Sequence, residues 1–184
     1  GVSIAGKLLG RNASVFPGKL AYDADTKILS KVKYPKYVIG VTGSSGKGST
    51  VELIYHTLTK AGYSVACNKV GSNGIYGITT LILNNVTLFK HKPKKDIFLI
   101  ELDERHIHLA FLKPILTHLV VTNITRDQPA RNKTPEFIYN KIFNAVKEKT
   151  HLIINADDSM VNKISTTYKD KITTYGISKT KYSY

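Results

Sequence analysis

The sequence has 184 residues, of which 42% are hydrophobic and 22% charged; this suits one soluble globular domain and is too short for two comfortable ones. Its 27 lysines and arginines against 13 acidic residues give a net charge of +14, so the expected partners are anions: phosphorylated small molecules, an anionic membrane surface or nucleic acid. The single cysteine, Cys67, excludes a disulfide framework, and no apolar run reaches the roughly 18 residues that a membrane-spanning helix needs.

After an N-terminal stretch of different character, short apolar segments alternate with helix-like ones. Residues 1–33 are predicted to form a helical lead-in with a turn at Phe16-Pro17-Gly18. The strands predicted after it are Tyr37–Thr42, Tyr63–Asn68, Ile97–Leu102, His118–Asn123, His151–Asn155 and Ile172–Tyr175. Helices are predicted from Ser49 to Ala61, ended by Gly62, and from Thr134, as N-cap, to about Lys149. This alternation predicts an α/β fold in which residues 34–184 form a mostly parallel sheet with helices on both faces.

A glycine-rich loop joins the first strand to its helix and consists of Gly43, Ser44, Ser45, Gly46, Lys47, Gly48, Ser49 and Thr50. Glycines leave the backbone N–H groups open to an anion, the helix N-terminus favours negative charge, and Lys47 can reach the outer phosphates. Ser49 is the predicted magnesium hydroxyl, with Thr50 next. The loop departs from G-x-x-x-x-G-K-[ST], because Val41 occupies the first glycine's place and Gly48 follows the lysine. It predicts ATP and Mg²⁺ as ligands, with a plain glycine-rich turn as the alternative.

Carboxylates follow the most hydrophobic strand. In a parallel sheet the ends of neighbouring strands meet at one edge, where ligands bind. Glu101 is therefore the predicted metal ligand, directly or through water. Asp103 and Glu104 are open to either of two roles, at the site or as caps of the next helix.

Five ordered motifs carry a resemblance to a known family. The loop is similar to the G-T-N-G-K-[TG]-[TS]-T segment of Mur ligases and folylpolyglutamate synthases. Further segments are similar, in the same order, to those of the MurT-type large subunit of lipid II isoglutaminyl synthase: 68–73 with 77–79, 100–104, 122–131, and 155–158 with 175–176. The sequence is thus identified as a member of the Mur ligase family, with residues 34–184 as its P-loop-type central ATP-binding domain and the family's C-terminal domain absent.

The resemblance implies a reaction and a set of site residues. ATP phosphorylates a substrate carboxylate, and an amine or ammonia attacks the acyl phosphate to form an amide. Glu101 would hold magnesium and Asn73 would face the substrate. The other residues expected on the substrate side are Asn123, Arg126, Asp127, Gln128 and Arg131. Because the family's C-terminal domain supplies the adenine contacts and a catalytic aspartate, no catalytic residue is assigned here. The chain alone is predicted to bind nucleotide weakly and not to complete a ligation.

The MurT-type resemblance implies a substrate and a partner. The substrate would be D-glutamate of a lipid-linked muropeptide, amidated in peptidoglycan synthesis with ammonia from a glutamine amidotransferase subunit. Most Mur ligases have histidine where this chain has Gln128, and a carbamylated lysine near the position of Phe143, where Lys141 is displaced. A single metal is therefore expected. Ala130 and Asn132-Lys133-Thr134 depart from the family pattern on the substrate side.

Two other functions stay open: addition of glutamate to a folate, and a P-loop ATPase or nucleic-acid-binding module that is not a ligase. The last predicts basic residues clustered with aromatic ones on one face. The lysines of this chain are scattered, so nucleic acid is the disfavoured partner. The expected location is the cytoplasm, where the positive charge also suits the inner face of an anionic membrane.

Overall fold

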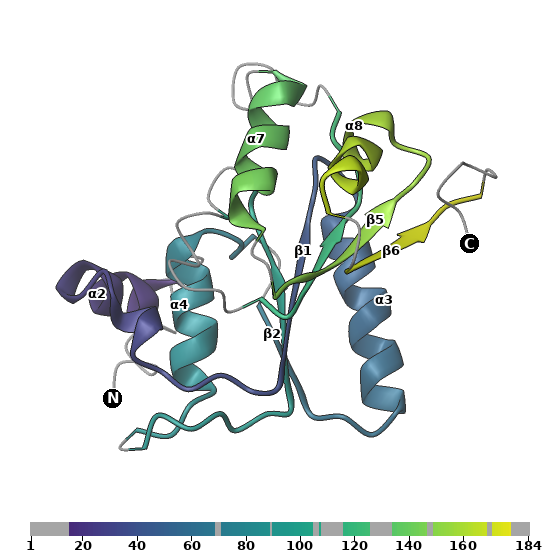
Figure 1. Cartoon of the computed structure of the whole chain (residues 1–184). Helices are drawn as coiled ribbons and strands as arrows, with labels where there is room; N and C mark the ends of the chain where they lie inside the picture. The colour runs from purple at the N-terminus through teal and green to yellow at the C-terminus, as the bar shows by residue number, and fades with distance from the viewer. Residues whose placement is uncertain are drawn as a thin grey trace.

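Six parallel strands form the sheet at the centre of the molecule (Figure 1). A computed structural model of the chain describes residues 15–68, 71–88, 90–104, 107, 116–125, 134–146, 149–168 and 171–177. The strands are β1 Tyr37–Thr42, β2 Val65–Cys67, β3 Ile97–Glu101, β4 His118–Val121, β5 His151–Asn155 and β6 Ile172–Tyr175. Their order across the sheet is β2-β3-β1-β4-β5-β6, and every adjacent pair is parallel. The predicted parallel sheet is confirmed.

Helices cover both faces of this sheet, as predicted. They are α2 Phe16–Ala24, α3 Lys47–Lys60, α4 Ile75–Asn84, α7 Pro135–Ala145 and α8 Ser159–Asn162, with short 3₁₀ turns at Ile28–Ser30 and Lys163–Thr166. Val51 of α3 packs on one face in a cluster with β1, β2, β3 and β4. The apolar sides of α4, α7 and α8 pack in a second cluster with the opposite face. Strand β3 lies between these clusters, and its residues Ile97 to Ile100 are at most 2% exposed, as expected of a strand covered on both sides.

Helix α4 was not predicted, because its sequence is dominated by β-branched residues that favour strands. Tertiary packing overrides that preference: Ile78 and Ile82 are buried at 1% and 0% exposure. The hydroxyls of Thr79 and Thr80 donate to the carbonyls of Ile75 and Tyr76, at 2.8 and 2.9 Å, so their polar atoms are satisfied within the helix.

The turn predicted at Phe16-Pro17-Gly18 is wrong: these residues form the first turn of α2. Proline lacks a backbone N–H, but in the first turn of a helix no hydrogen bond is lost, because an N–H there would have no acceptor within the helix. Gly18 serves the close approach of α2 to α4, since its N–H donates to Thr80 Oγ1 at 2.8 Å. The boundary between a lead-in and a central domain at residues 33 and 34 stays a prediction.

We expect Gly18→Ala to destabilise the protein, because a Cβ there would lie 2.0 Å from the carbonyl oxygen of Tyr76. Overpacking of this kind costs about 1–3 kcal/mol, which corresponds to a fall in Tm of roughly 2–12 °C in a domain of this size. Thermal unfolding followed by circular dichroism would measure it. Gly74→Ala is the control, since a Cβ at Gly74 would meet nothing within 4 Å; equal shifts for the two variants would contradict the packing argument.

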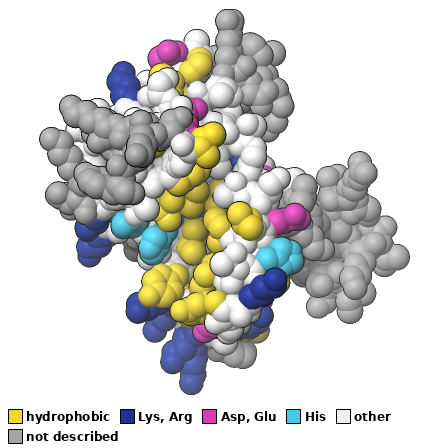
Figure 2. All heavy atoms as spheres, turned by 90° about the vertical axis from the view of Figure 1, so that its right-hand side faces the viewer, with side chains coloured by type: hydrophobic (Ala, Val, Ile, Leu, Met, Phe, Trp, Pro, Cys, Tyr) yellow, Lys and Arg dark blue, Asp and Glu magenta, His cyan; other side chains and the backbone are white. Residues whose placement is uncertain are grey.

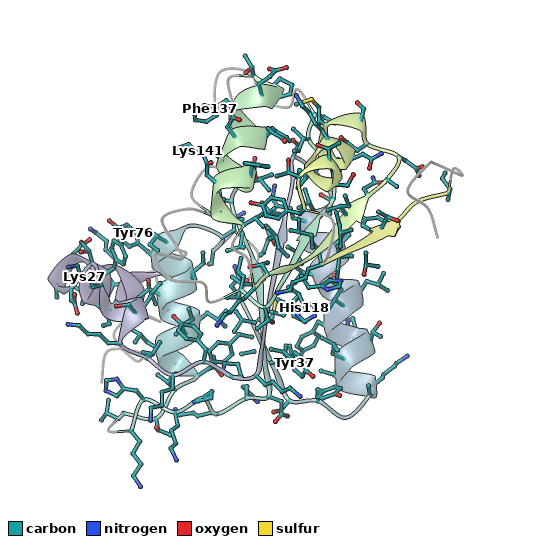
Figure 3. The ribbon with its side chains drawn as sticks, in the orientation of Figure 1. Lys27, Tyr37, Tyr76, His118, Phe137 and Lys141 are labelled. Carbon is teal, nitrogen blue, oxygen red and sulfur yellow. The ribbon has the colours of Figure 1, made fainter. Side chains whose placement is uncertain are left out.

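His118 lies on the α3 face of the sheet between Tyr37 and His151, with ring centroids 6.1 and 5.6 Å away (Figure 3). Figure 2, which views the molecule from the side of α3, shows a band of hydrophobic side chains running down this face. Burial, and then the neighbouring His151, lower the pKa of His118 below its usual value of 6.5. The folded state therefore disfavours the protonated imidazole.

That lowered pKa predicts acid destabilisation. Because the unfolded chain binds the proton more readily, stability should fall as the pH drops through 6.5 and level off below the folded pKa. We expect His118→Gln to reduce the difference in Tm between pH 7.5 and pH 5.5. His56→Gln, an exposed histidine of α3, is the matched control. An unchanged pH dependence in His118→Gln would contradict the prediction.

Candidate nucleotide-binding site

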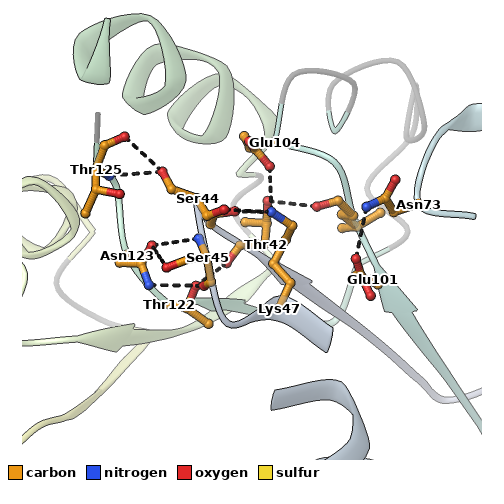
Figure 4. A network of polar contacts seen from close by, with 12 residues as sticks. Thr42, Ser44, Ser45, Lys47, Asn73, Glu101, Glu104, Thr122, Asn123 and Thr125 are labelled. Atoms are coloured by element: carbon orange, nitrogen blue, oxygen red, sulfur yellow. Dashed lines mark hydrogen bonds and ion pairs between the residues drawn. The ribbon is translucent and has the colours of Figure 1, made fainter. Parts of the chain in front are cut away.

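The glycine-rich loop lies where the carboxyl ends of three adjacent strands meet (Figure 4). β1 runs between β3 and β4, so the loop that follows Thr42 has Glu101 on one side and Thr122 and Asn123 on the other. This edge is the expected position for a ligand in an open parallel sheet. The sequence motifs at the ends of β1, β3 and β4 are thus brought together by the topology.

Two glycines in the left-handed region shape the loop. Gly43 has φ +136° and Gly46 has φ +76°. Gly46 is the N-cap of α3, which begins at Lys47, two residues earlier than predicted. The N-terminus of a helix of 14 residues therefore points at the loop, and such an end attracts anions through its N–H groups and its dipole.

Lys47 is held inside the loop by three oxygens. Its ammonium donates to the carbonyls of Gly43 and Ser44 and forms an ion pair with Glu104 Oε2 at 3.1 Å. The side chains of Lys47 and Glu104 are only 14% and 6% exposed. Of the two roles left open for Glu104, the structure has it at the site, as the partner of Lys47. A phosphate oxygen could take the place of the carboxylate, because both are anionic acceptors of the ammonium.

The end of β4 fixes the other side of the loop. Asn123 Oδ1 accepts the N–H of Ser45 at 2.9 Å, and Asn123 Nδ2 donates to the Ser45 carbonyl at 3.1 Å. Thr122 Oγ1 donates to the same carbonyl at 2.8 Å. The Ser44 hydroxyl bridges to the backbone of Thr125, donating to its carbonyl at 3.2 Å and accepting its N–H at 3.0 Å. β4 ends at Val121, two residues before the predicted strand does, and the side chains of Thr122 and Asn123 bond to the loop instead.

The end of β5 supports this segment in turn. Asn155 Nδ2 donates to the Thr122 carbonyl at 3.0 Å, and Asp158 Oδ2 accepts the N–H of Ile124 at 3.0 Å. Asp158 is also the N-cap of α8, with Oδ1 accepting the N–H of Val161. Residues 155–158 thus form a turn that ends β5 and caps α8, and the Asp158 carboxylate also fixes the segment after β4.

On the β3 side, Glu101 is partly buried and faces the start of α3. A Cβ on Gly48 would lie 3.6 Å from Glu101 Oε2, while Asn73 Nδ2 donates to Glu101 Oε1 at 2.9 Å. Ser49 and Thr50 lie in the first turn of α3. The side chain of Ser49 is exposed, whereas the hydroxyl of Thr50 donates to the carbonyl of Gly46 at 2.8 Å.

The oxygen atoms of Glu101 and Ser49 are of the kinds that Mg²⁺ takes as ligands when it is bound together with a nucleotide. The part of the chain that the structure describes has no group of three or more His, Cys, Asp or Glu side chains that could hold a metal ion. Mg²⁺ does not need one, because it commonly takes one or two carboxylates, a hydroxyl and phosphate oxygens. Glu101 and Ser49 are residues that could hold it, with the remaining ligands from phosphate and water.

Sequence reasoning missed Asn68 and the pairing of Glu104. Asn68 was predicted as the last residue of a strand and as part of the resembling segment 68–73, without a role of its own, yet it is buried and bonds to the backbone of Glu101. The rule that located Glu101, that strand ends share an edge, could have found it. The remaining predicted substrate residues, Arg126, Asp127, Gln128 and Arg131, lie outside the described residues.

The parallel sheet and the glycine loop define an α/β domain of the P-loop type, and the family follows from its sequence. The family model described as "Mur ligase middle domain" matches residues 41–184. The chain therefore belongs to the Mur ligase family, as the resemblance predicted.

Individual relatives agree with this membership. The chain is 31% identical over 175 residues to the MurT subunit of lipid II isoglutaminyl synthase (glutamine-hydrolyzing) from Staphylococcus aureus; the match covers 94% of the chain and 39% of that relative. The MurF ligase of Thermotoga maritima in complex with ADP superposes with a TM-score of 0.61 at 24% identity, over 90% of this chain and 36% of that one. FolC of Escherichia coli, in complex with DHPP and ADP, superposes with a TM-score of 0.55 at 17% identity, over 83% of this chain and 46% of that one. The MurF and FolC structures show the shared fold.

We expect Asn123→Ala to weaken nucleotide binding, because both ends of its amide hold Ser45 in place. Loss of two hydrogen bonds of about 1 kcal/mol each predicts a rise in the Kd for ATP of up to roughly 30-fold, measurable by calorimetry. Asn162→Ala, at the far end of α8, is the control. A Kd within twofold of wild type for Asn123→Ala would show that the loop holds its shape without this side chain.

Proposed function

We propose that this chain is the nucleotide-binding part of an ATP-dependent carbon–nitrogen ligase that amidates D-glutamate of a lipid-linked muropeptide. The observation that carries the proposal is the glycine loop at the sheet edge, with Lys47 inside it and Glu101 beside it. Membership of the Mur ligase family supports the ligase class. The chain spans 39% of the curated relative's length, so the complete reaction is proposed for a protein that also has the remaining parts of that relative.

The residues at this edge have distinct tasks in the proposed reaction. The N-terminus of α3 would bind the phosphates of ATP, because the N–H groups of Ser44 and Ser45 already donate to Asn123. Lys47 would exchange its contact with Glu104 for the outer phosphates and stabilise the charge that develops on them. Glu101 and the hydroxyl of Ser49 would hold a magnesium ion, which when bound neutralises charge on the transferring phosphoryl group.

The phosphoryl group would pass to a substrate carboxylate, and ammonia would then displace phosphate from the acyl phosphate. Asn123, Arg126, Asp127, Gln128 and Arg131 are the proposed residues toward the substrate. A glutamine amidotransferase subunit is the proposed source of ammonia, in accordance with the name of the S. aureus relative. Among the described residues, no helix has the length and hydrophobicity of a membrane span. We propose that a lipid-linked substrate is met at the inner membrane face, because the net charge of +14 suits an anionic membrane surface.

Folate glutamylation is the second candidate function. The fold of FolC is shared, and the Gly48-Ser49-Thr50 ending of the loop resembles the folate enzymes. The 31% identity with MurT over 94% of the chain favours the muropeptide, because it extends well beyond the loop.

The experiment has two stages. ATP binding to the chain with magnesium should be measurable by calorimetry, and its absence would overturn the proposal at the level of the loop. A protein extended to include the family's C-terminal domain would then receive ATP, magnesium and ammonium, with either lipid-linked muropeptide or a folate plus glutamate. Amidated muropeptide in mass spectra supports the proposal, whereas glutamylated folate as the only product would replace it with the second function.

A further inference from the structure

Two asparagines hold Glu101 from different directions. Asn68, which is 9% exposed, accepts the N–H of Glu101 on Oδ1 at 2.8 Å. Its Nδ2 donates to the carbonyls of Glu101 and Ser72, both at 3.0 Å. One side chain thus pairs both backbone groups of Glu101, at the point where β3 leaves the sheet.

Asn73 holds the side chain of the same glutamate (Figure 4). Its Nδ2 donates to Glu101 Oε1 at 2.9 Å. The other carboxylate oxygen, Oε2, is the one nearest Gly48 at the start of α3. The carboxylate is thereby oriented, with one oxygen on the amide and the other toward the phosphate loop.

This side-chain contact is not required to attach the segment that carries Asn73. The carbonyl of Asn73 already accepts the N–H of Asp103 at 3.0 Å, and Asn68 bonds to the Ser72 carbonyl. The backbone of Ser72 and Asn73 is therefore tied to the end of β3 and to Asn68 independently of the Asn73 amide. What the amide adds is the orientation of one carboxylate.

We propose that Asn73 is a positioning residue for Glu101 as the magnesium ligand, and that Asn68 fixes the backbone from which Glu101 projects. The proposal rests on the proposed function, because it takes Glu101 as a ligand of the metal. It gives Asn73 a task beyond the contact with substrate that the family resemblance implies. Mg²⁺ requires near-ideal octahedral geometry, so a ligand with a fixed rotamer binds it better than a mobile one. Partners of metal ligands typically change metal affinity 10- to 100-fold when removed.

The test measures the Kd for ATP in EDTA and the Kd for ATP with magnesium. The first Kd divided by the second gives a ratio that states how much magnesium strengthens ATP binding. We expect Asn73→Ala to lower this ratio about 10-fold relative to wild type. Asn123→Ala is the matched control: it removes the same side chain from the same edge, but from contacts with Ser45 rather than Glu101. It should raise both Kd values and keep the ratio. Electron paramagnetic resonance of Mn²⁺ with ATP gives a second readout, in which Asn73→Ala should show weaker metal binding.

The outcomes separate this inference from the function on which it rests. A wild-type ratio in Asn73→Ala, with wild-type Mn²⁺ binding, overturns the positioning role while leaving the ATP site intact. A wild-type chain that binds no ATP in either condition overturns the proposed function and the metal site with it. Asn68→Ala should lower Tm and also the ratio, measured below its Tm; a lower Tm with a wild-type ratio overturns the part assigned to Asn68.

Discussion

Gly43→Ala is expected to be a severely damaging substitution in the loop, with a loss of about 2–6 kcal/mol in the free energy of unfolding. Two costs add. The backbone at Gly43 has φ +136°, a region that residues with a Cβ avoid at a cost of order 1–3 kcal/mol. The new Cβ would also lie 2.2 Å from Thr122 Oγ1 and 2.9 Å from the Asn123 carbonyl oxygen, and overpacking adds about 1–3 kcal/mol.

The neighbouring atoms have little freedom to move away. Thr122 Oγ1 donates to the carbonyl of Ser45 at 2.8 Å and has the carbonyl of Thr42 as a longer alternative acceptor at 3.2 Å. Its β-branched side chain is also rotationally restricted. We therefore expect the loop to shift, with at least a 10-fold loss of ATP affinity and a fall in Tm of roughly 10 °C. Chemical denaturation and calorimetry measure the two effects.

Gly46→Ala provides the matched control. Its φ is +76°, and a Cβ there would meet nothing within 4 Å. Only the left-handed backbone conformation should therefore lower the free energy of unfolding, by about 1–2 kcal/mol. Equal destabilisation in the two variants would mean that the contact with β4 contributes nothing. The pair thus separates backbone strain from the close approach of the loop to Thr122 and Asn123.

The strands of the sheet and their parallel arrangement could be predicted from the sequence, because both depend on patterns within short stretches of the chain. Strands β1, β5 and β6 were predicted with the observed bounds, since each is a short β-rich run between turn residues. The position of the glycine loop between β1 and α3 was predicted correctly, whereas its phosphate binding stays a prediction. Glu101 was placed at the ligand edge because it ends a buried parallel strand, and the structure has it there; its metal role stays a prediction. Thr134 was predicted as the N-cap of α7, and its side chain accepts from the N–H of Phe137.

What could not be predicted depends on contacts distant in sequence. Helix α4 forms because Ile78 and Ile82 are buried against other elements, which local propensity does not record. The Lys47–Glu104 pair joins residues 57 positions apart, and Asn68 bonds to a residue 33 positions away. The substrate side remains a prediction, because the residues assigned to it, apart from Asn73 and Asn123, lie outside the described ranges.

Lys47→Ala is expected to abolish measurable ATP binding and to destabilise the fold, and the two effects can be separated. The substitution removes the cation beside a carboxylate that is only 6% exposed. Removing one partner of a buried ion pair typically costs about 3–5 kcal/mol, because the remaining charge stays desolvated. Loss of ATP binding in this variant alone would therefore not distinguish a missing phosphate ligand from a damaged loop.

The double substitution Lys47→Ala with Glu104→Gln resolves this, because glutamine keeps the shape of the glutamate without its charge. We expect most of the lost stability to return, with a coupling energy of roughly 2 kcal/mol or more in the double-mutant cycle. ATP affinity should stay at least 10-fold below wild type, because the ammonium is still missing. If affinity returned together with stability, Lys47 would act only as the counter-ion of Glu104, and the phosphates would be bound by the backbone of the loop and the N-terminus of α3. If the coupling energy were near zero, the ion pair would not stabilise the loop, and Lys47 would act on the nucleotide alone.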